Sequence, residues 1–451
     1  MRDPLARRVA GFGTSIFSEI TALALRHGAV NLGQGFPDFA GPEFVKRAAA
    51  EAIAADLNQY APAPGLPRLR QAVAAQWERD TGRAVDWERE VTVTSGATEG
   101  LCDAMLSLLD PGDRAIVFAP AYDAYIPDIT MAGAEPLVVR LHPPERAKNQ
   151  EPRTGTASHE EHEKSSGSKN SKLNTQHSEL PAGDNSKLKT QNSKLSWWFD
   201  PEELRAAFRL GPRLIVVNTP HNPTGKVFSR AELELIAGLC VEHDVIALCD
   251  EVYDRMTFDG AEHVSLATLP GMWERTLTLN SAGKTFSVTG WKIGYAVGGE
   301  RLNHALRQAH QWVTFATATP LQQATAVAIE QAAESGYYAE LRREYAERRD
   351  LLRGVLEQAG LPTLPVEGAY FISADIGALG HTDDLAFCRA LTSDIGVAAI
   401  PTSVFYPDPA DAPPLARFCF AKRHETILAA GERLVRLGAQ QNQERKNRPE
   451  S

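Results

Sequence analysis

The chain has 451 residues, of which 43% are hydrophobic, and its formal net charge is -10. This length and apolar content suffice for two packed domains, which excludes a disordered or fibrous protein. Acidic and basic residues are interspersed without the basic stripe that nucleic-acid binding requires, so we expect no nucleic-acid partner. The apolar runs are too short to span a bilayer, and we therefore expect a cytoplasmic protein without membrane association.

Seven short β-rich runs are spread along the first three hundred residues and alternate with helical stretches. The predicted strands are residues 89–96, 114–120, 135–141, 213–220, 245–251, 276–283 and 294–299. Predicted helices lie between several of them at residues 98–109, 199–210 and 230–244. This alternation predicts an α/β domain with a mostly parallel sheet that is covered by helices on both faces.

A polar segment interrupts this pattern at residues 143–196. It contains no Val, Ile, Met, Phe, Tyr, Trp or Cys, and the string NSKL occurs in it three times. Such a segment cannot bury enough apolar area to offset the entropy of ordering it, so we predict a disordered surface insertion. The helical pattern resumes immediately afterwards, where Asp200 is the expected cap and Pro201 the first helical residue.

The end of the chain differs from the alternating region. A long helix is predicted at residues 337–358, where apolar side chains recur at helical spacing. We expect a large domain at residues 46–330, a smaller α+β domain formed by residues 1–45 and 331–440, and a disordered tail at residues 441–451.

The cysteines point to neither a disulfide framework nor a metal site. Their number is odd, they are far apart, and no C-x-x-C pair or nearby histidine accompanies them. The five residues are Cys102, Cys240, Cys249, Cys388 and Cys419. We interpret them as small buried side chains and expect no metal.

Several polar strings follow the predicted strands, where functional groups of such domains gather. In SAGK, Ser281 precedes Lys284 by three residues, and Lys292 follows eight residues later. A lone lysine at such a place is usually exposed surface. In DEVY, Asp250 and Tyr253 are candidates to project into a crevice, although the aspartate alone could be a helix cap.

Two further strings follow strands. NTPHNPTGK contains Asn222, which by itself indicates only a turn. SGATEG leads from a strand into a helix, so the amides around Ala97 and Thr98 could hold a phosphate at the positive helix end. Gly-rich turns of this kind serve many ligands, and the string is weak evidence alone.

Taken together, the strings resemble the fold-type I pyridoxal-phosphate enzymes, specifically class I aminotransferases near the kynurenine, glutamine and methionine aminotransferases. The resemblance rests on LGQGFPDF, NQYAPAPGLPRLR, SGATEG, PAYDAY, NTPHNPTGKVF, DEVY, SAGKTFSVTGWKIGY and RFCFAKRHE in this order. It spans nearly the whole chain apart from the insertion. It implies a seven-stranded type of large-domain sheet and pyridoxal 5'-phosphate as cofactor.

The resemblance also implies residue roles around the cofactor. Lys284 would bind it covalently as a Schiff base and later move a proton at the substrate α-carbon. Asp250 would keep the pyridine nitrogen protonated, so that the ring accepts electrons. Asn222 and Tyr253 would donate hydrogen bonds to the phenolic oxygen, and Tyr122 would stack on the ring.

For the phosphate, the resemblance implies a set drawn from three strings, namely Ala97, Thr98, Ser281 and Lys292. Tyr60 would reach the phosphate from a second subunit, and Phe315 would also cross the interface. We therefore expect a homodimer.

For the substrate, the resemblance implies that Arg417 binds the α-carboxylate through two parallel hydrogen bonds. Gly35 would let its backbone approach the same carboxylate, and Asn222 would border it. The expected side-chain pocket residues are Phe17, Tyr125 and Phe315. Relatives carry aromatic and histidine residues where this chain has Ala282 and Ser287, which leaves the side-chain preference open.

The predicted activity is transfer of an amino group from an α-amino acid of methionine, glutamine, kynurenine or aromatic type to a 2-oxo acid. The alternatives are a carbon–sulfur β-lyase acting on cystathionine or cysteine conjugates, and a succinyldiaminopimelate aminotransferase, which would want an additional cation. A metabolite-sensing regulator on the same fold is a further alternative, but the sequence lacks an added helix-turn-helix segment.

Overall fold

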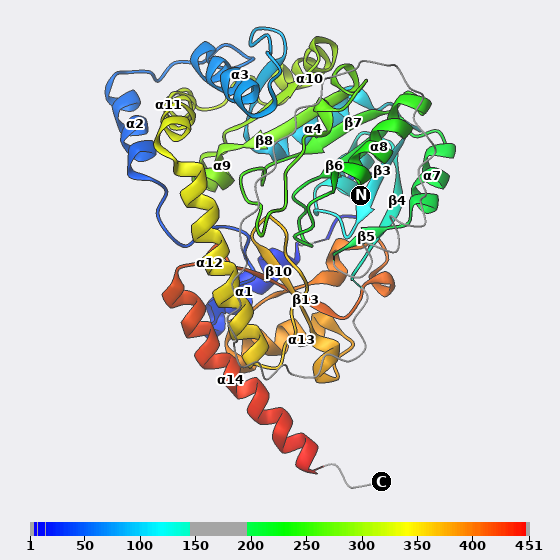
Figure 1. The fold of residues 1–451 in the computed structure, drawn as a ribbon, viewed down its shortest axis with the longest axis vertical. Helices are drawn as coiled ribbons and strands as arrows, with labels where there is room; N and C mark the ends of the chain where they lie inside the picture. Colours follow the sequence, from blue (N-terminus) through cyan, green and yellow to red (C-terminus); the bar gives the residue numbers. More distant parts are fainter. Residues whose placement is uncertain (1–3, 7, 14, 145–195, 448–451) are drawn as a thin grey trace, which may run out of the picture.

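The computed structural model describes residues 4–6, 8–13, 15–144 and 196–447, with side chains up to residue 437. Its largest feature is an eight-stranded sheet in the order β2-β9-β8-β7-β6-β3-β4-β5 (Figure 1). The strands are β2 (Val91–Thr94), β3 (Arg114–Ala119), β4 (Glu135–His142), β5 (Trp198–Phe199), β6 (Leu214–Asn218), β7 (Ile246–Asp250), β8 (Thr276–Ser281) and β9 (Gly294–Gly298).

The sheet is mostly parallel, as predicted. Strands β4, β3, β6, β7 and β8 run parallel, whereas β9 is antiparallel to both β8 and β2. All seven predicted strands are confirmed. The eighth, β5, was not predicted: its two residues pair antiparallel with the end of β4, opposite Leu141 and His142, and a two-residue strand carries no periodicity.

Helices surround this sheet. They are α2 (Glu43–Ala54), α3 (Pro67–Thr81), α4 (Gly96–Leu108), α5 (Tyr125–Met131), α7 (Pro201–Arg209), α8 (Arg230–His243), α9 (Ala282–Thr285), α10 (Glu300–Val313) and α11 (Thr319–Ser335). The predicted helices correspond to α4, α7 and α8. The Asp200 side chain accepts a hydrogen bond from the N–H of Glu202, which confirms the predicted cap of α7.

Both faces of the sheet are buried, which explains why its strands read as continuous apolar runs. Along β6, Val216 belongs to the apolar cluster that includes Leu101 of α4. Its neighbour Val217 belongs to the opposite cluster, which contains Phe208 of α7 and Ile236 of α8. Alternate strand residues thus pack under different helices.

The remaining elements form a smaller α+β unit at the other end of the molecule (Figure 1). They are α1 (Ile16–His27), β1 (Val30–Asn31), α12 (Tyr337–Gln358), β10 (Phe371–Asp375), α13 (Asp384–Ala390), β11 (Val397–Ala398), β12 (Ile400–Pro401), β13 (Leu415–Cys419) and α14 (His424–Asn447). The predicted long helix is α12.

Two small sheets join the ends of the chain. Near the N-terminus, β1 pairs with β11, and β13 lies between β10 and β12 in a three-stranded antiparallel sheet. These pairings bring a strand near the N-terminus together with strands after residue 331. The long helix α12 runs from the large sheet's end of the molecule to this unit (Figure 1).

Two expectations about unstructured segments have different outcomes. The polar insertion lies outside the described residues except at its ends. The tail expected from residue 441 requires correction, because α14 continues to Asn447. The sequence there is rich in Gln, Glu, Arg and Lys, which favour a helix.

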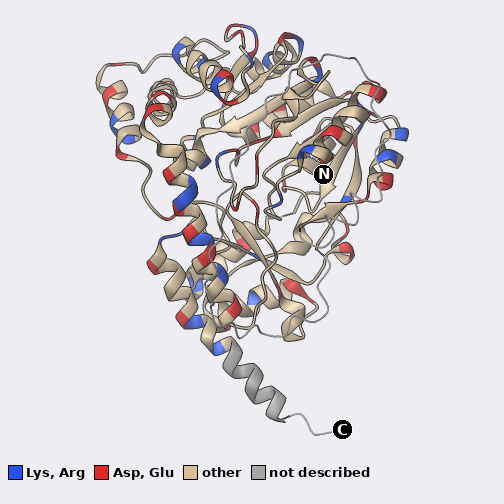
Figure 2. Cartoon of the chain, in the orientation of Figure 1, with Lys and Arg blue, Asp and Glu red and all other residues tan. Residues whose placement is uncertain are grey.

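Charged residues of both signs are interspersed along the helices and loops of the chain (Figure 2). Among the described residues, no helix combines the length and apolarity needed to cross a membrane. The five cysteines are free, and four of them are buried.

Candidate active site

A cavity of about 250 Å³ lies where the ends of the central strands meet the smaller unit. Most of the sequence-predicted site residues line it: Phe17, Gly35, Ala97, Thr98, Tyr122, Asn222, Asp250, Tyr253, Ser281, Lys284, Lys292 and Arg417. They come from segments between residues 17 and 417. The topology thus collects them at one edge of the sheet, as expected for an α/β domain.

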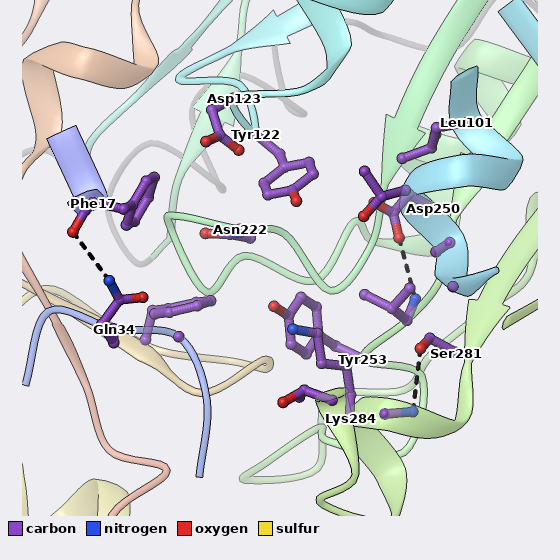
Figure 3. Close-up of a pocket in the computed structure, with 18 of the residues that line it drawn as sticks. Phe17, Gln34, Leu101, Tyr122, Asp123, Asn222, Asp250, Tyr253, Ser281 and Lys284 are labelled. Atoms are coloured by element: carbon purple, nitrogen blue, oxygen red, sulfur yellow. Dashed lines mark hydrogen bonds between the residues drawn. The ribbon is translucent and has the colours of Figure 1, made fainter. Parts of the chain in front are cut away.

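Lys284 and Asp250 form the polar centre of the cavity (Figure 3). Asp250 ends β7, and Lys284 lies in the short helix α9 that follows β8. Burial lowers the pKa of Lys284 to about 8, and the nearby cations Lys292 and Arg417 act in the same direction. About a tenth of this amine is therefore uncharged at pH 7, far more than for an ordinary lysine, and is available as a nucleophile or base.

Asp250 is a buried carboxyl that needs a cation. Only 5% of it is exposed, and burial raises its pKa, although a hydrogen bond from Tyr125 and the charge of Lys284 oppose the shift. The Tyr125 hydroxyl lies 2.6 Å from its Oδ2. A cationic ring nitrogen against the carboxylate would stabilise its charge.

A candidate anion site lies in the same cavity, where α4 begins. Lys292 has φ of 55° and Gly96 has φ of 72°, and a Cβ at Gly96 would stand 3.2 Å from the Nζ of Lys292. A Cβ at Gly294 would stand 2.5 Å from the carbonyl carbon of Gly96, so β9 approaches the helix start too closely for a side chain. The left-handed backbone of Lys292 is a strained conformation of the kind found at ligand sites.

This site suits a phosphate. The first N–H groups of α4, at Ala97 and Thr98, have no partner within their own helix, and the positive helix end favours an anion. Ser281 and Lys292 line the same cavity and supply a hydroxyl and an ammonium.

Arg417 is held by hydrogen bonds from two of its three side-chain nitrogens, and the third has no partner among the described residues. On β13, its side chain donates to Asn222 Oδ1 at 2.9 Å and to the carbonyl of Gly33 at 3.0 Å. Its guanidinium carbon lies 4.1 Å from the ring centre of Phe371. Its Nε is buried without a hydrogen-bond partner, and within the described residues it forms no ion pair with a carboxylate. A buried cation in this state favours a carboxylate ligand.

Three predicted residues lie outside the cavity lining. Tyr125 was expected in the side-chain pocket, but it is 2% exposed and its hydroxyl is engaged by Asp250, so the structure places it behind the site. Tyr60 and Phe315 lie on the surface with 83% and 48% exposure. Their rings contact each other edge to face, with centroids 5.4 Å apart.

Sequence reasoning did not select eight further lining residues: Gln34, Gly96, Leu101, Asp123, Val252, Gly283, Thr289 and Phe371. Gln34 orients Phe17, because its side-chain amide donates to the Phe17 carbonyl at 3.1 Å (Figure 3). Asp123 directly follows Tyr122 in the PAYDAY string. Its charge next to a predicted site residue could have identified it as a candidate. Phe371 lies in a strand without a motif and could not be found this way.

Comparison with known proteins agrees with this geometry. The profile of the family described as "Aminotransferase class I and II" matches residues 28–169 and 181–434. The chain belongs to this family. It is therefore an enzyme that transfers amino groups, built on the fold-type I architecture predicted from its motifs.

Individual relatives are similar over nearly their whole length. Kynurenine–oxoglutarate transaminase of Dictyostelium discoideum is 38% identical, and the match covers 96% of both chains. Methionine aminotransferase of Escherichia coli is 36% identical over 94% of this chain and 96% of its own. The solved N-succinyldiaminopimelate aminotransferase of Mycobacterium tuberculosis is 39% identical, covers 96% of this chain and 100% of its own, and has a TM-score of 0.81.

Proposed function

We propose that this enzyme uses pyridoxal 5'-phosphate to move the amino group of an α-amino acid, of methionine, glutamine, kynurenine or aromatic type, to a 2-oxo acid. One observation carries the proposal. A single cavity is lined by a half-buried Lys284, by Asp250 and by an Arg417 whose Nε has no partner. A lysine for covalent cofactor binding thus lies near a cation for the substrate carboxylate.

The residues present fit the cofactor at each of its polar groups. The amides of Ala97 and Thr98, with Ser281 and Lys292, would hold the phosphate. Asp250 would face the ring nitrogen, whose positive charge suits a buried carboxylate. Tyr122 would stack against the ring face, and Asn222 and Tyr253 would donate hydrogen bonds to the phenolic oxygen. Bound there, the cofactor would supply an electron sink for the substrate α-carbon.

The chain's own residues would position the substrate and move its proton. Arg417 would take the α-carboxylate with two of its N–H groups that make no hydrogen bond within the described part of the chain, and Gly35 would allow close approach of the backbone. A Cβ at Gly35 would lie 2.9 Å from the ring of Phe371, so no side chain fits there. Lys284, with its lowered pKa, would take the α-proton and return it to the product side.

We further propose a homodimer in which Tyr60 and Phe315 complete the site of the partner subunit. Both rings are exposed in the single chain, and Trp312, near the end of α10, is 84% exposed. Exposed aromatic side chains of this kind are typical of a protein interface. The five free cysteines favour a reducing compartment, and we place the enzyme in the cytoplasm.

Two alternatives share these contacts. A β-lyase would use the same lysine and cofactor. A succinyldiaminopimelate aminotransferase would need a cation for a distal carboxylate. Among the described residues that line the cavity, the Lys and Arg side chains are Lys284, Lys292 and Arg417, each of which already has a role. Because no further Lys or Arg is left among the described lining residues for a distal carboxylate, these residues favour amino donors of the methionine, glutamine, kynurenine or aromatic type over succinyldiaminopimelate.

Single-turnover spectroscopy of the cofactor-loaded enzyme tests the proposal. Methionine, glutamine, kynurenine, an aromatic amino acid and cystathionine would each be mixed with the enzyme in excess. We expect conversion of the cofactor to its pyridoxamine form with at least one of the first four. Release of pyruvate and ammonia from cystathionine, without pyridoxamine formation from any donor, would instead establish the lyase.

A further inference from the structure

Asp123 is an ionisable lining residue that the proposed chemistry leaves unused. It lies between β3 and α5, directly after Tyr122, and lines the same cavity as Arg417. Figure 3 shows it beside Tyr122 on the wall of the cavity, on the side of Asn222 where Phe17 also lies. Within the described residues, its carboxylate forms no ion pair and no hydrogen bond with another side chain.

The charge of Asp123 acts inside the cavity. Asp123 is exposed as a residue, yet partial desolvation of its carboxyl at the cavity wall raises the pKa of that carboxyl, and the cation of Arg417 opposes the shift. The interaction is mutual, because Asp123 acts on the pKa of Arg417 in the direction that keeps the guanidinium charged. The charges of Asp123 and Arg417 therefore interact across the cavity in which a substrate would bind.

The other directions in the cavity already have occupants in the proposed complex. Arg417 fixes the α-carboxylate and Lys284 faces the α-carbon, while Asp250, Ser281 and Lys292 belong to the cofactor. The substrate side chain must then leave past the remaining wall, which includes Phe17 and Asp123. Phe17 supplies an apolar surface there, and Asp123 supplies a negative charge.

We propose that Asp123 is a specificity-determining residue. It favours α-amino acids whose side chains end in an N–H donor, such as an amide or an aromatic amine, and it disfavours those that carry a second carboxylate. The inference rests on the proposed function. Its physical basis is that a carboxylate accepts hydrogen bonds from N–H groups and repels like charge in a partly desolvated site.

The variant Asp123→Asn removes the charge with little change in shape, and it tests the proposed specificity when it is assayed with two substrates of equal shape. Glutamine and glutamate have the same shape and differ in one amide and one charge, and methionine serves as an uncharged reference. The half-reaction kcat/KM would be measured for all three donors. We expect the variant to gain about three- to tenfold for glutamate, to lose several-fold for glutamine, and to change less than about twofold for methionine.

A matched control is Asp110→Asn, which removes the same charge from an exposed residue outside the cavity lining. It should leave all three values unchanged. A second variant, Asp123→Ser, should shift the glutamate to glutamine ratio in the same direction as Asp123→Asn. Agreement between the two would attribute the shift to the lost charge.

The outcomes separate this inference from the proposed function. If wild type reacts with methionine but both Asp123 variants keep its glutamate to glutamine ratio, Asp123 has no part in specificity and the proposed function stands. If wild type forms pyridoxamine with no donor, the proposed function fails and this inference fails with it.

Discussion

At the scale of single residues, Arg417 and Asp250 show how burial creates a need for a ligand. Each is enclosed, and each retains a group whose charge the surrounding protein does not fully balance. For Arg417 this group is the unpartnered Nε. For Asp250 it is a carboxylate whose pKa is raised by burial and lowered by Tyr125 and Lys284. Buried ionisable groups of this kind at a cavity wall are a stronger indication of function than the residue types alone.

Replacing Arg417 by lysine should weaken substrate binding selectively. Lysine keeps the positive charge but loses the planar guanidinium, which can offer two parallel hydrogen bonds to a carboxylate. We expect KM for α-amino acids to rise about tenfold or more, with a smaller fall in kcat because the α-proton is less well directed at Lys284. Steady-state kinetics on amino acids and on simple amines would measure this.

Amines without a carboxylate should react no worse with the Arg417→Lys variant than with wild type. The control Arg47→Lys changes an exposed arginine on α2 and should behave as wild type. Equal KM values for amino acids in wild type and Arg417→Lys would place the carboxylate site elsewhere.

We expect Tyr125 to influence the reaction through Asp250. Its hydroxyl donates the 2.6 Å hydrogen bond that stabilises the charged carboxylate, so Tyr125→Phe should raise the pKa of Asp250 further. We expect kcat to fall about tenfold and the acidic limb of the pH–rate profile to move to higher pH. The control Tyr338→Phe removes a hydroxyl that bonds Gln76 outside the cavity. An unmoved pH profile in Tyr125→Phe would show that this tyrosine only fills space.

At the scale of elements, a charged histidine connects the candidate anion site to the loop that carries Tyr60. His310 of α10 bonds Glu99 of α4 at 2.7 Å and the carbonyl of Ala63 at 2.9 Å. Asp103 lies 3.5 Å away, and ligand-type atoms of the three ionisable residues lie within 4.8 Å of one another. Burial opposes the charge of the imidazole, but the neighbouring Asp103 carboxylate and the hydrogen bond to Glu99 raise the pKa of His310 to about 9.

The raised pKa of His310 predicts how the stability of the folded protein changes with pH. Because the pKa of His310 is raised by folding, its contribution is fully present below its ordinary pKa of about 6.5 and is lost as pH rises through about 9. The difference in melting temperature between wild type and His310→Gln should therefore shrink over that range. His304→Gln, at an exposed position of the same helix, is the control. A difference that stays constant with pH would mean that His310 is neutral in the folded chain.

At the scale of the whole molecule, local patterns predicted the elements but not the contacts between them. Strands such as β6 are buried on both faces, so their apolar runs were visible, and Lys284 and Asp250 stood in strings that follow such strands. Tyr125 could not be placed from sequence, because its role depends on which buried group its hydroxyl meets. Phe371 reaches the cavity from the smaller unit, and no local pattern encodes that packing of two sheets.

The central claim is that Lys284 carries the cofactor. Borohydride reduction of the purified, cofactor-loaded enzyme would fix a lysine-bound cofactor irreversibly, and peptide mass spectrometry would then locate the added mass. The lowered pKa of Lys284 and its place beside Asp250 predict labelling of Lys284 alone, with none at Lys292 in the same cavity. Labelling of Lys292 or any other lysine instead, or no covalent label in a protein that binds the cofactor, would contradict this account.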